Sequence, residues 1–434
     1  MRRKFIAIAL LLGATAAQAA PPASEAELRN TITTLVGFGT RHSLSDTASP
    51  TRGIGAARKW AVDKFAAISA DCGNCLIIAQ PSAMKTSARV PTPANIVDVL
   101  AILPGTTDPA RVIIMSAHID SRNSDPLDAK GDAPGANDDG SGTAAVIEAA
   151  RLLSKQKFPA TIVFAVLSGE EQGLLGGKLL AETAKAKGWK VEAVLNNDIV
   201  GNSRGSGGAR DDKTVRVFSE GTKAVETPEQ ANRRRYNGGE VDSPARNLSR
   251  YIAALPDAGI AVEQVWRTDR FGRGGDQVPM LEAGYPAVRI TERQEHYDRQ
   301  HQNVRSENGR AFGDTIDGVD FAYLARVTNL NVRALAALAS APGTPTGVAI
   351  EGQVSPDTTI RWNAVPGASG YRIWWRPTTA TAWTEHRDVA ADATSLVLKG
   401  IDIDSWFFGV SALGSDGSAS PVVFPGPAGA FISD

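Results

Sequence analysis

At 434 residues, the chain is longer than an ordinary single domain, so its length favours two or three domains. Its 46 Lys and Arg residues nearly balance its 47 Asp and Glu residues, which gives no reason to expect nucleic acid or an anionic surface as a partner. Apolar residues make up 42% of the chain, which is enough for a large core.

The first twenty residues have the features of a signal peptide. A basic start at residues 2–4 is followed by an apolar run at 5–12 and by a small-residue cleavage site at 17–19. The apolar run is too short for a permanent membrane span, and no later run is long enough to form one. We therefore expect residues 1–20 to be removed and the mature chain to be exported, into the periplasm or the medium.

The chain contains two cysteines, Cys72 and Cys75, in a C-x-x-C spacing. In a cytosolic protein this spacing would favour a redox pair or half of a zinc site. Behind a signal peptide, and without a second pair, it favours a local disulfide. A loop this short constrains the unfolded chain only slightly, so we expect modest stabilisation.

The first half of the chain alternates predicted helices and strands. Apolar residues at helical spacing predict helices at residues 24–38 and 54–68, and short extended segments are expected at 76–79 and 95–103. Three short, mainly apolar runs then indicate buried parallel strands. The runs lie at residues 112–115, 162–167 and 191–195, and between them come a helix with Ser141 as its N-cap and a helix at 174–186.

Polar loops alternate with regular elements up to residue 340. Residues 203–212 predict a surface loop, and residues 226–240, with three consecutive arginines, predict a solvated one. Strands are expected at 214–219 and 287–290, helices at 243–255 and 319–338, and a polar segment at 271–276. The order of elements predicts an α/β domain over residues 21–340, with a mixed, mainly parallel sheet flanked by helices.

The pattern changes at residues 341–345, which are rich in Pro and Gly. Beyond them, polar and apolar residues alternate in runs at 359–362, 371–375 and 406–410, separated by turn residues. This pattern predicts a small antiparallel β-sandwich over residues 341–434. The Pro-rich entry and the aromatic strands resemble a fibronectin type III module.

Polar residues follow each of the three buried runs. His118 and Asp120 come after the first run, Glu170 and Glu171 after the second, and Asp198 after the third. Because the carboxyl ends of parallel strands meet at one edge of an open sheet, we expect these side chains to converge. One His among several carboxylates suggests a hydrolytic metal centre.

Some of these groups also have ordinary explanations. A surface His beside an Asp is common, but Asp120 can also accept the second N–H of a metal-bound His118 and fix its orientation. Asp138 lies in the sequence GANDDGSG at 135–142, which turn chemistry explains equally well. If Asp138 is functional, its two oxygens can bridge two metal ions about 3.5–4 Å apart.

The adjacent pair Glu170 and Glu171 is the most telling signal. Neighbouring carboxylates at the end of an apolar strand are unfavourable unless a cation compensates them. Because adjacent side chains diverge, one can bind metal while the other moves protons on a water at the metal. A last ligand is expected downstream, where His296 and His301 follow an apolar run, and chemistry alone leaves the choice between them open.

In sequence order, H-x-D, GANDDGSG, SGEE, ND and a late His resemble the M28 family of zinc peptidases, over roughly residues 95–332. The resemblance implies a zinc exopeptidase-like fold that holds two zinc ions. One ion takes the positions of His118 and Asp198, and the other takes Glu171 and the late His. Asp138 bridges the two ions.

The same resemblance assigns further roles. It implies that Glu170 is the general base, which takes a proton from the attacking water and returns it to the leaving amine, and that a cis peptide bond precedes Asp139. The segment HQNVR at 301–305 is similar to a His-Gln-Asp-Val-Arg segment found in a subgroup that carries a C-terminal fibronectin-like module. This similarity favours His301 over His296.

The resemblance therefore implies a secreted aminopeptidase that acts on peptides or proteins with a free N-terminus, and a monomer is favoured. Three other functions compete with this one. They are a single-zinc glutaminyl cyclase on the same fold, another amide-cleaving exopeptidase such as a carboxypeptidase, and a non-catalytic peptide-binding protein. Metal content and a panel of free and blocked peptide termini would separate them.

Overall fold

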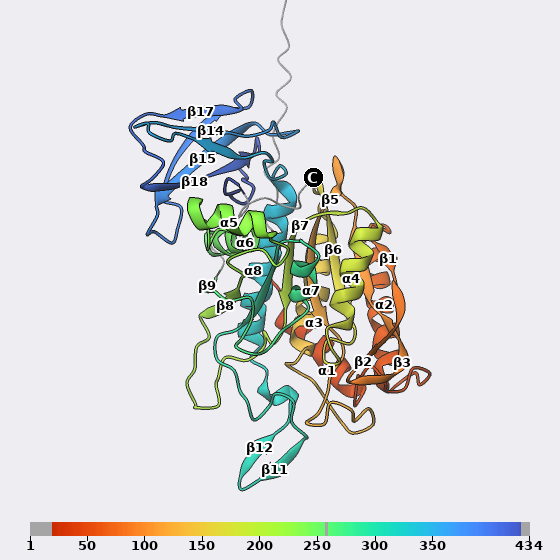
Figure 1. Ribbon diagram of the computed structural model, residues 1–434. Helices are drawn as coiled ribbons and strands as arrows, with labels where there is room; N and C mark the ends of the chain where they lie inside the picture. The colour runs from red at the N-terminus through yellow and green to blue at the C-terminus, as the bar shows by residue number, and fades with distance from the viewer. Residues whose placement is uncertain (1–19, 257–258, 427–434) are drawn as a thin grey trace, which may run out of the picture.

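The computed structural model describes residues 20–256 and 259–426 (Figure 1). The predicted signal peptide lies at residues 1–20, so nearly all of it falls outside the described residues. Within those two ranges, no helix is both long enough and apolar enough to cross a membrane.

A mixed sheet of eight strands forms the centre of the larger part of the molecule, in the order β1-β4-β6-β5-β7-β10-β8-β9. The four central strands run parallel, and the strands at either side are antiparallel to the central ones that they pair with. The strands are β1 (Ile77–Ala79), β4 (Val99–Leu103), β5 (Asp108–His118), β6 (Ala160–Leu167), β7 (Lys190–Asn197), β8 (Thr214–Phe218), β9 (Ala261–Val265) and β10 (Ala287–Glu292). The predicted mixed, mainly parallel sheet is confirmed.

Helices cover both faces of this sheet (Figure 1). One face packs against α1 (Glu25–Gly37), α2 (Gly53–Asp71), α3 (Gly140–Leu153) and α8 (Phe321–Ser340), and the other against α4 (Leu175–Ala186) and α7 (Gln277–Glu282). In β5, Ile113 and Met115 join the first layer, while Val112 and Ile114 join the second. A strand buried on both faces carries a continuous apolar run, which is why the sequence predicted it.

The start of α3 differs from the prediction. Asp139, and not Ser141, is the N-cap, because its carboxylate accepts a hydrogen bond from Gly142 N at 3.0 Å. The Ser141 hydroxyl instead donates to Asn137 O at 2.7 Å and accepts from Val200 N at 3.0 Å. Ser141 therefore ties the start of the helix to the segment after β7.

The predicted solvated loop around the arginine triplet is wrong, because these residues form helix α5 (Pro228–Asn237). A capping box between Thr227 and Gln230, with Pro228 in the first turn, explains why the helix begins there. No residue of the helix is buried. The next helix, α6 (Pro244–Ala253), lies where the sequence placed it.

Two small hairpins extend from the main sheet. β2 (Ser82–Ser87) pairs with β3 (Val90–Val97), and β11 (Arg305–Glu307) pairs with β12 (Arg310–Phe312). A short 3-10 helix, η1 (Ile316–Gly318), follows the second hairpin and leads to α8.

The C-terminal part consists of two three-stranded antiparallel sheets (Figure 1). The sheets are β13-β14-β17 and β16-β15-β18, formed by β13 (Ala349–Glu351), β14 (Thr358–Arg361), β15 (Gly370–Pro377), β16 (Glu385–Ala390), β17 (Ser395–Leu398) and β18 (Trp406–Leu413). Ile360, Trp362, Tyr371 and Phe408 belong to the core between them. Arg376 of β15 donates to both carboxylate oxygens of Asp242 at 2.8 Å, which joins this part to the main body.

Candidate metal centre

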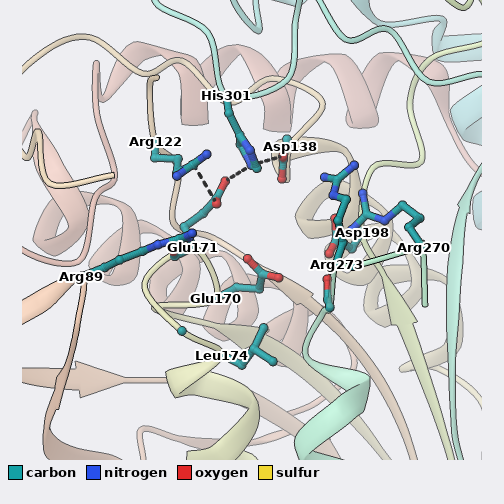
Figure 2. Close-up of a pocket in the computed structure, with 13 residues that line it drawn as sticks. Arg89, Arg122, Asp138, Glu170, Glu171, Leu174, Asp198, Arg270, Arg273 and His301 are labelled. Carbon is teal, nitrogen blue, oxygen red and sulfur yellow. Dashed lines mark hydrogen bonds and ion pairs between the residues drawn. The ribbon is translucent and has the colours of Figure 1, made fainter. Parts of the chain in front are cut away.

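The candidate ligands lie at the carboxyl ends of the central strands. His118 is the last residue of β5, Glu171 follows β6, and Asp198 follows β7. Because these strands are parallel, their ends meet at one edge of the sheet. Asp138 reaches the same place from the loop before α3, and His301 from the loop after β10 (Figure 2).

These five residues form two groups that share Asp138. In the first, His118 Nε2 lies 3.3 Å from Asp138 Oδ1 and 4.0 Å from Asp198 Oδ1. In the second, His301 Nε2 lies 3.0 Å from Asp138 Oδ2 and 2.9 Å from Glu171 Oε1. Asp138 therefore turns one oxygen toward each histidine.

The donor atoms fit two bound cations. His118 Nε2 and Glu171 Oε1 are buried and make no well-aligned hydrogen bond among the described residues, although Asp138 Oδ1 and His301 Nε2 lie at ion-pair distance from them. A bound cation would satisfy both atoms. With zinc–ligand bonds of about 2.0–2.2 Å and tetrahedral angles, two ligands of one zinc lie roughly 3.4 Å apart. The separations given above range from 2.9 to 4.0 Å, around this value, and His and carboxylate are ordinary zinc ligands.

Asp120 holds the ligand-bearing segments together. It is fully buried, and its two carboxylate oxygens accept hydrogen bonds from Glu170 N at 3.2 Å and Glu171 N at 3.1 Å. Its Oδ1 also lies 3.5 Å from His118 Nδ1. Burial acts to raise the pKa of Asp120, but the bonds and charge of His118 and the backbone amides outweigh burial and lower it. A charged Asp120 is thus available to orient His118.

Asp139 fixes a second set of segments. The peptide bond between Asp138 and Asp139 is cis, as the resemblance implied. The Asp139 carboxylate accepts hydrogen bonds from His118 N at 3.2 Å and Ile199 N at 3.2 Å, besides that from Gly142 N. It therefore links the end of β5, the start of α3 and the end of β7, and its pKa is raised well above the usual value, chiefly by burial.

Glu170 occupies a different environment from Glu171. Its side chain lines the cavity over the two ligand groups (Figure 2). Burial raises its pKa well above the usual value, and the nearby charges of Asp198 and Glu171 raise it further, against the opposing effect of His118. A carboxylate with a raised pKa is suited to accept and return a proton.

Sequence reasoning missed two supporting residues. Arg289 is fully buried in β10, contacts Asp198 Oδ2 through Nη1, and donates to Asp198 O at 3.2 Å. Its signal was a charged residue inside the apolar run 287–290. Asp314 accepts from Asp138 N at 2.7 Å and from Asn137 N at 2.9 Å, and burial raises its pKa to about 7. Nothing in the local sequence marks Asp314.

The two late histidines lie in different places. His301 belongs to the second ligand group, whereas His296 lines a separate cavity with Arg204 and Arg299. The predicted disulfide between Cys72 and Cys75 is present.

Comparisons with known proteins agree with this geometry. The model of peptidase family M28 matches residues 98–320. A probable zinc metalloprotease of Leptosphaeria maculans is 44% identical over 412 residues, which are 93% of this chain and 95% of that protein. Another, from Pyricularia oryzae, is 42% identical and covers 93% of this chain and 82% of its own length.

Among solved structures, the LapA aminopeptidase of Legionella pneumophila is similar with a TM-score of 0.53 at 20% identity, over 73% of this chain and 72% of that one. A leucine aminopeptidase precursor of Bacteroides thetaiotaomicron has a TM-score of 0.50 at 15% identity, over 73% of this chain and 98% of that one. At such low identity these likenesses show a shared fold.

Proposed function

The chain belongs to peptidase family M28, and from this premise we propose that it is an exported aminopeptidase that works with two zinc ions. The observation that carries the proposal is the pair of ligand groups joined by Asp138. A single-ion site needs one such group, whereas here each histidine faces its own oxygen of Asp138, and the buried Glu171 Oε1 of the second group makes no well-aligned hydrogen bond among the described residues.

In this proposal, His118 and Asp198 would hold one zinc ion, Glu171 and His301 the other, and Asp138 both. When bound, such a pair supplies Lewis acidity, which polarises a peptide carbonyl and lowers the pKa of water. Asp120 orients His118 and fixes the backbone of the two glutamates, so it is a positioning residue.

Glu170 is the group that moves protons. Its raised pKa and its place on the cavity wall suit it to take a proton from the attacking water. The same carboxyl then protonates the leaving amine, and Glu170 returns to its starting state. General acid–base catalysis of this kind contributes about 10²- to 10⁴-fold in rate.

An end-on substrate fits the cavity over the two ligand groups. Its volume is about 420 Å³, which is room for a terminal residue. The Legionella protein that shares the fold is an aminopeptidase, which supports N-terminal rather than C-terminal cleavage. The substrates proposed here are therefore peptides or proteins with a free N-terminus, bound by a monomer.

Export is supported by two features of the N-terminal region. The sequence of residues 1–20 has the pattern of a signal peptide, and the disulfide between Cys72 and Cys75 suits an oxidising compartment.

The test compares the mature wild-type protein with Glu170→Gln. Zinc per chain is measured by elemental analysis, and hydrolysis is followed on an aminoacyl anilide with a free or an acetylated amine. We expect about two zinc ions per chain in both proteins, and a loss of about 10²-fold or more in kcat in the variant. Glu182→Gln is the matched control, because Glu182 is exposed on α4 and pairs with Lys85.

Each contrary outcome selects another function. One zinc per chain with turnover of N-terminal Gln peptides would favour a glutaminyl cyclase and remove the bridging role of Asp138. Cleavage of the acetylated substrate would rule out an aminopeptidase. Absence of any hydrolysis of the anilides by zinc-loaded wild type would leave the carboxypeptidase and the binding protein, and cleavage of an N-acetylated peptide with a free C-terminus would separate these two.

A further inference from the structure

The wall of the cavity is unusual for a site that would bind an apolar side chain. Among the described residues that line it, four are arginines and only Leu174 supplies an apolar side chain. Two of the arginines, Arg89 and Arg122, lie on one side of the cavity, and Arg270 and Arg273 lie on the other (Figure 2). The guanidinium groups on both sides favour a substrate group that accepts hydrogen bonds and carries negative charge.

On one side, Arg89 is available for a ligand. It lies in the turn between β2 and β3, is exposed, and donates to the backbone oxygen of Glu171 at 2.8 Å. Within the described part of the chain, no carboxylate forms an ion pair with it. The contact to Glu171 O places the guanidinium at the mouth of the site while leaving further N–H groups for another acceptor.

On the other side, guanidinium groups outnumber the carboxylates that they contact. Within the ranges that the structure describes, Arg216, Arg270 and Arg273 contact only two carboxylates besides those of the ligand groups: Glu295, which lies 2.5 Å from Arg216, 3.1 Å from Arg273 and 3.6 Å from Arg270, and Asp269, which lies 3.1 Å from Arg270. The Arg270 Nη1 atom is buried and has no hydrogen-bond partner among the described residues. The Arg273 side chain is 33% exposed and faces the cavity, so part of this positive charge is open to a bound molecule.

The remaining anions of the cavity do not neutralise these arginines in the proposed enzyme. The carboxylates on its floor are Glu170 and three of the metal ligands, and two divalent cations would offset their charge. The arginines then leave an excess of positive charge on the wall, next to the position of the scissile bond.

We propose that this wall binds a carboxylate of the substrate through Arg89 on one side or Arg273 on the other, so that the enzyme prefers peptides with an acidic group close to the bond that it cleaves. The inference rests on the proposed aminopeptidase function. A guanidinium matches a carboxylate with two parallel hydrogen bonds, which an amide of the same shape cannot fully replace. The carboxylate comes from one of two sources: the side chain of an N-terminal Asp or Glu, or the free C-terminus of a dipeptide.

The experiment uses the zinc-loaded full chain and two pairs of substrates. Glu-anilide against Gln-anilide tests the side-chain source, and Leu-Gly against Leu-Gly-amide tests the C-terminal source. In each pair only one member carries the additional carboxylate. For at least one pair, we expect kcat/KM to favour the charged member about 10- to 100-fold, the range for hydrogen bonds to a charged group.

Arg273→Gln and Arg89→Gln are then compared with wild type, and Arg235→Gln serves as the matched control on the exposed surface of α5. We expect the charged-to-neutral ratio to fall at least about fivefold in Arg273→Gln or Arg89→Gln, and to stay at the wild-type value in the control. The preference should also weaken as salt is raised, because the cavity is partly open. Arg89 is exposed, so its variant is expected to fold even if the other does not.

Equal kcat/KM values within both substrate pairs would overturn the inference while leaving the aminopeptidase in place. A preference that persists unchanged in both arginine variants would overturn it as well. Failure of wild type to cleave any of the four substrates would instead overturn the proposed function, and this inference with it. The pair that shows the preference identifies the source of the carboxylate.

Discussion

Replacement of Asp120 by Asn gives a sharp test of how the site is held together. The substitution keeps the size of the side chain but replaces one acceptor oxygen with an NH2 group, which is a donor. In the wild-type protein, both carboxylate oxygens of Asp120 accept backbone hydrogen bonds, one from Glu170 N and the other from Glu171 N. In either orientation, an asparagine would leave one of these amides facing another donor.

The magnitude follows from this loss. A buried donor left without an acceptor costs about 1–3 kcal/mol. The variant also loses the negative charge beside His118 Nδ1, which lies 3.5 Å from Asp120 Oδ1. Loss of such a partner of a metal-binding histidine typically costs about 10- to 100-fold in metal affinity or activity. We therefore expect Asp120→Asn to bind zinc about 10- to 100-fold more weakly and to lose activity at limiting zinc.

Zinc affinity is measured by competition with a coloured chelator at fixed pH, and activity is followed as zinc is added back. Asp128→Asn is the control, because Asp128 accepts backbone hydrogen bonds from Lys130 and Gly131 but lies in an outer loop away from the ligands. Asp120→Asn with wild-type zinc affinity and wild-type kcat would refute the idea that Asp120 positions the ligands.

Two further predictions concern stability. Asp242→Ala should destabilise the protein by about 3–5 kcal/mol, because it leaves Arg250 and Arg376 buried without their carboxylate, and an unfolding midpoint close to the wild-type value would contradict this. The control Asp388→Ala removes a largely exposed pair and should cost no more than about 1 kcal/mol. Burial raises the pKa of Glu220 to about 8, so the folded protein keeps this carboxyl protonated while the unfolded chain ionises it from about pH 4.5 upward. Glu220→Gln should therefore gain stability relative to wild type as pH rises from about 4.5 to 8, by about 5 kcal/mol at most, since each unit of pKa corresponds to about 1.4 kcal/mol. The difference is measured by urea titration, and a difference that does not change with pH would contradict the prediction.

The sheet was predictable because its central strands are buried on both faces. In β5, Val112 and Ile114 pack toward one layer of helices, and Ile113 and Met115 toward the other, so every position must be apolar. The edge strands lack this constraint. Strand β16, with the sequence EHRDVA, is almost wholly exposed and was not predicted, because its charged side chains carry no core-facing pattern.

Helix α5 shows a signal that was present but outweighed. Thr227, Pro228 and Gln230 form a start sequence that the structure uses in full. The helix has no buried residue, so its sequence shows no apolar periodicity, and its three arginines favoured a loop. Capping residues deserve more weight than composition in segments of this kind.

The ligands of the candidate site were predictable, but the residues that support them were not. Its ligands follow apolar strands, and their spacing along the chain reflects the topology that brings them together. Asp314 and Arg289 support them from positions far along the chain, and only Arg289 stands out from its neighbours in sequence. Supporting residues are selected by tertiary contacts, which local patterns do not encode.

The positive charge of the cavity wall was likewise not predictable from the composition of the chain. The whole chain has 46 basic and 47 acidic residues, and this near balance gives no sign of a local excess of positive charge. The excess arises in the folded chain, where Arg216 of β8 contacts Glu295, which also contacts Arg270 and Arg273. Positive charge near a pair of divalent cations weakens their binding by repulsion. In the proposed enzyme, a substrate carboxylate bound by one of these arginines would compensate part of this charge.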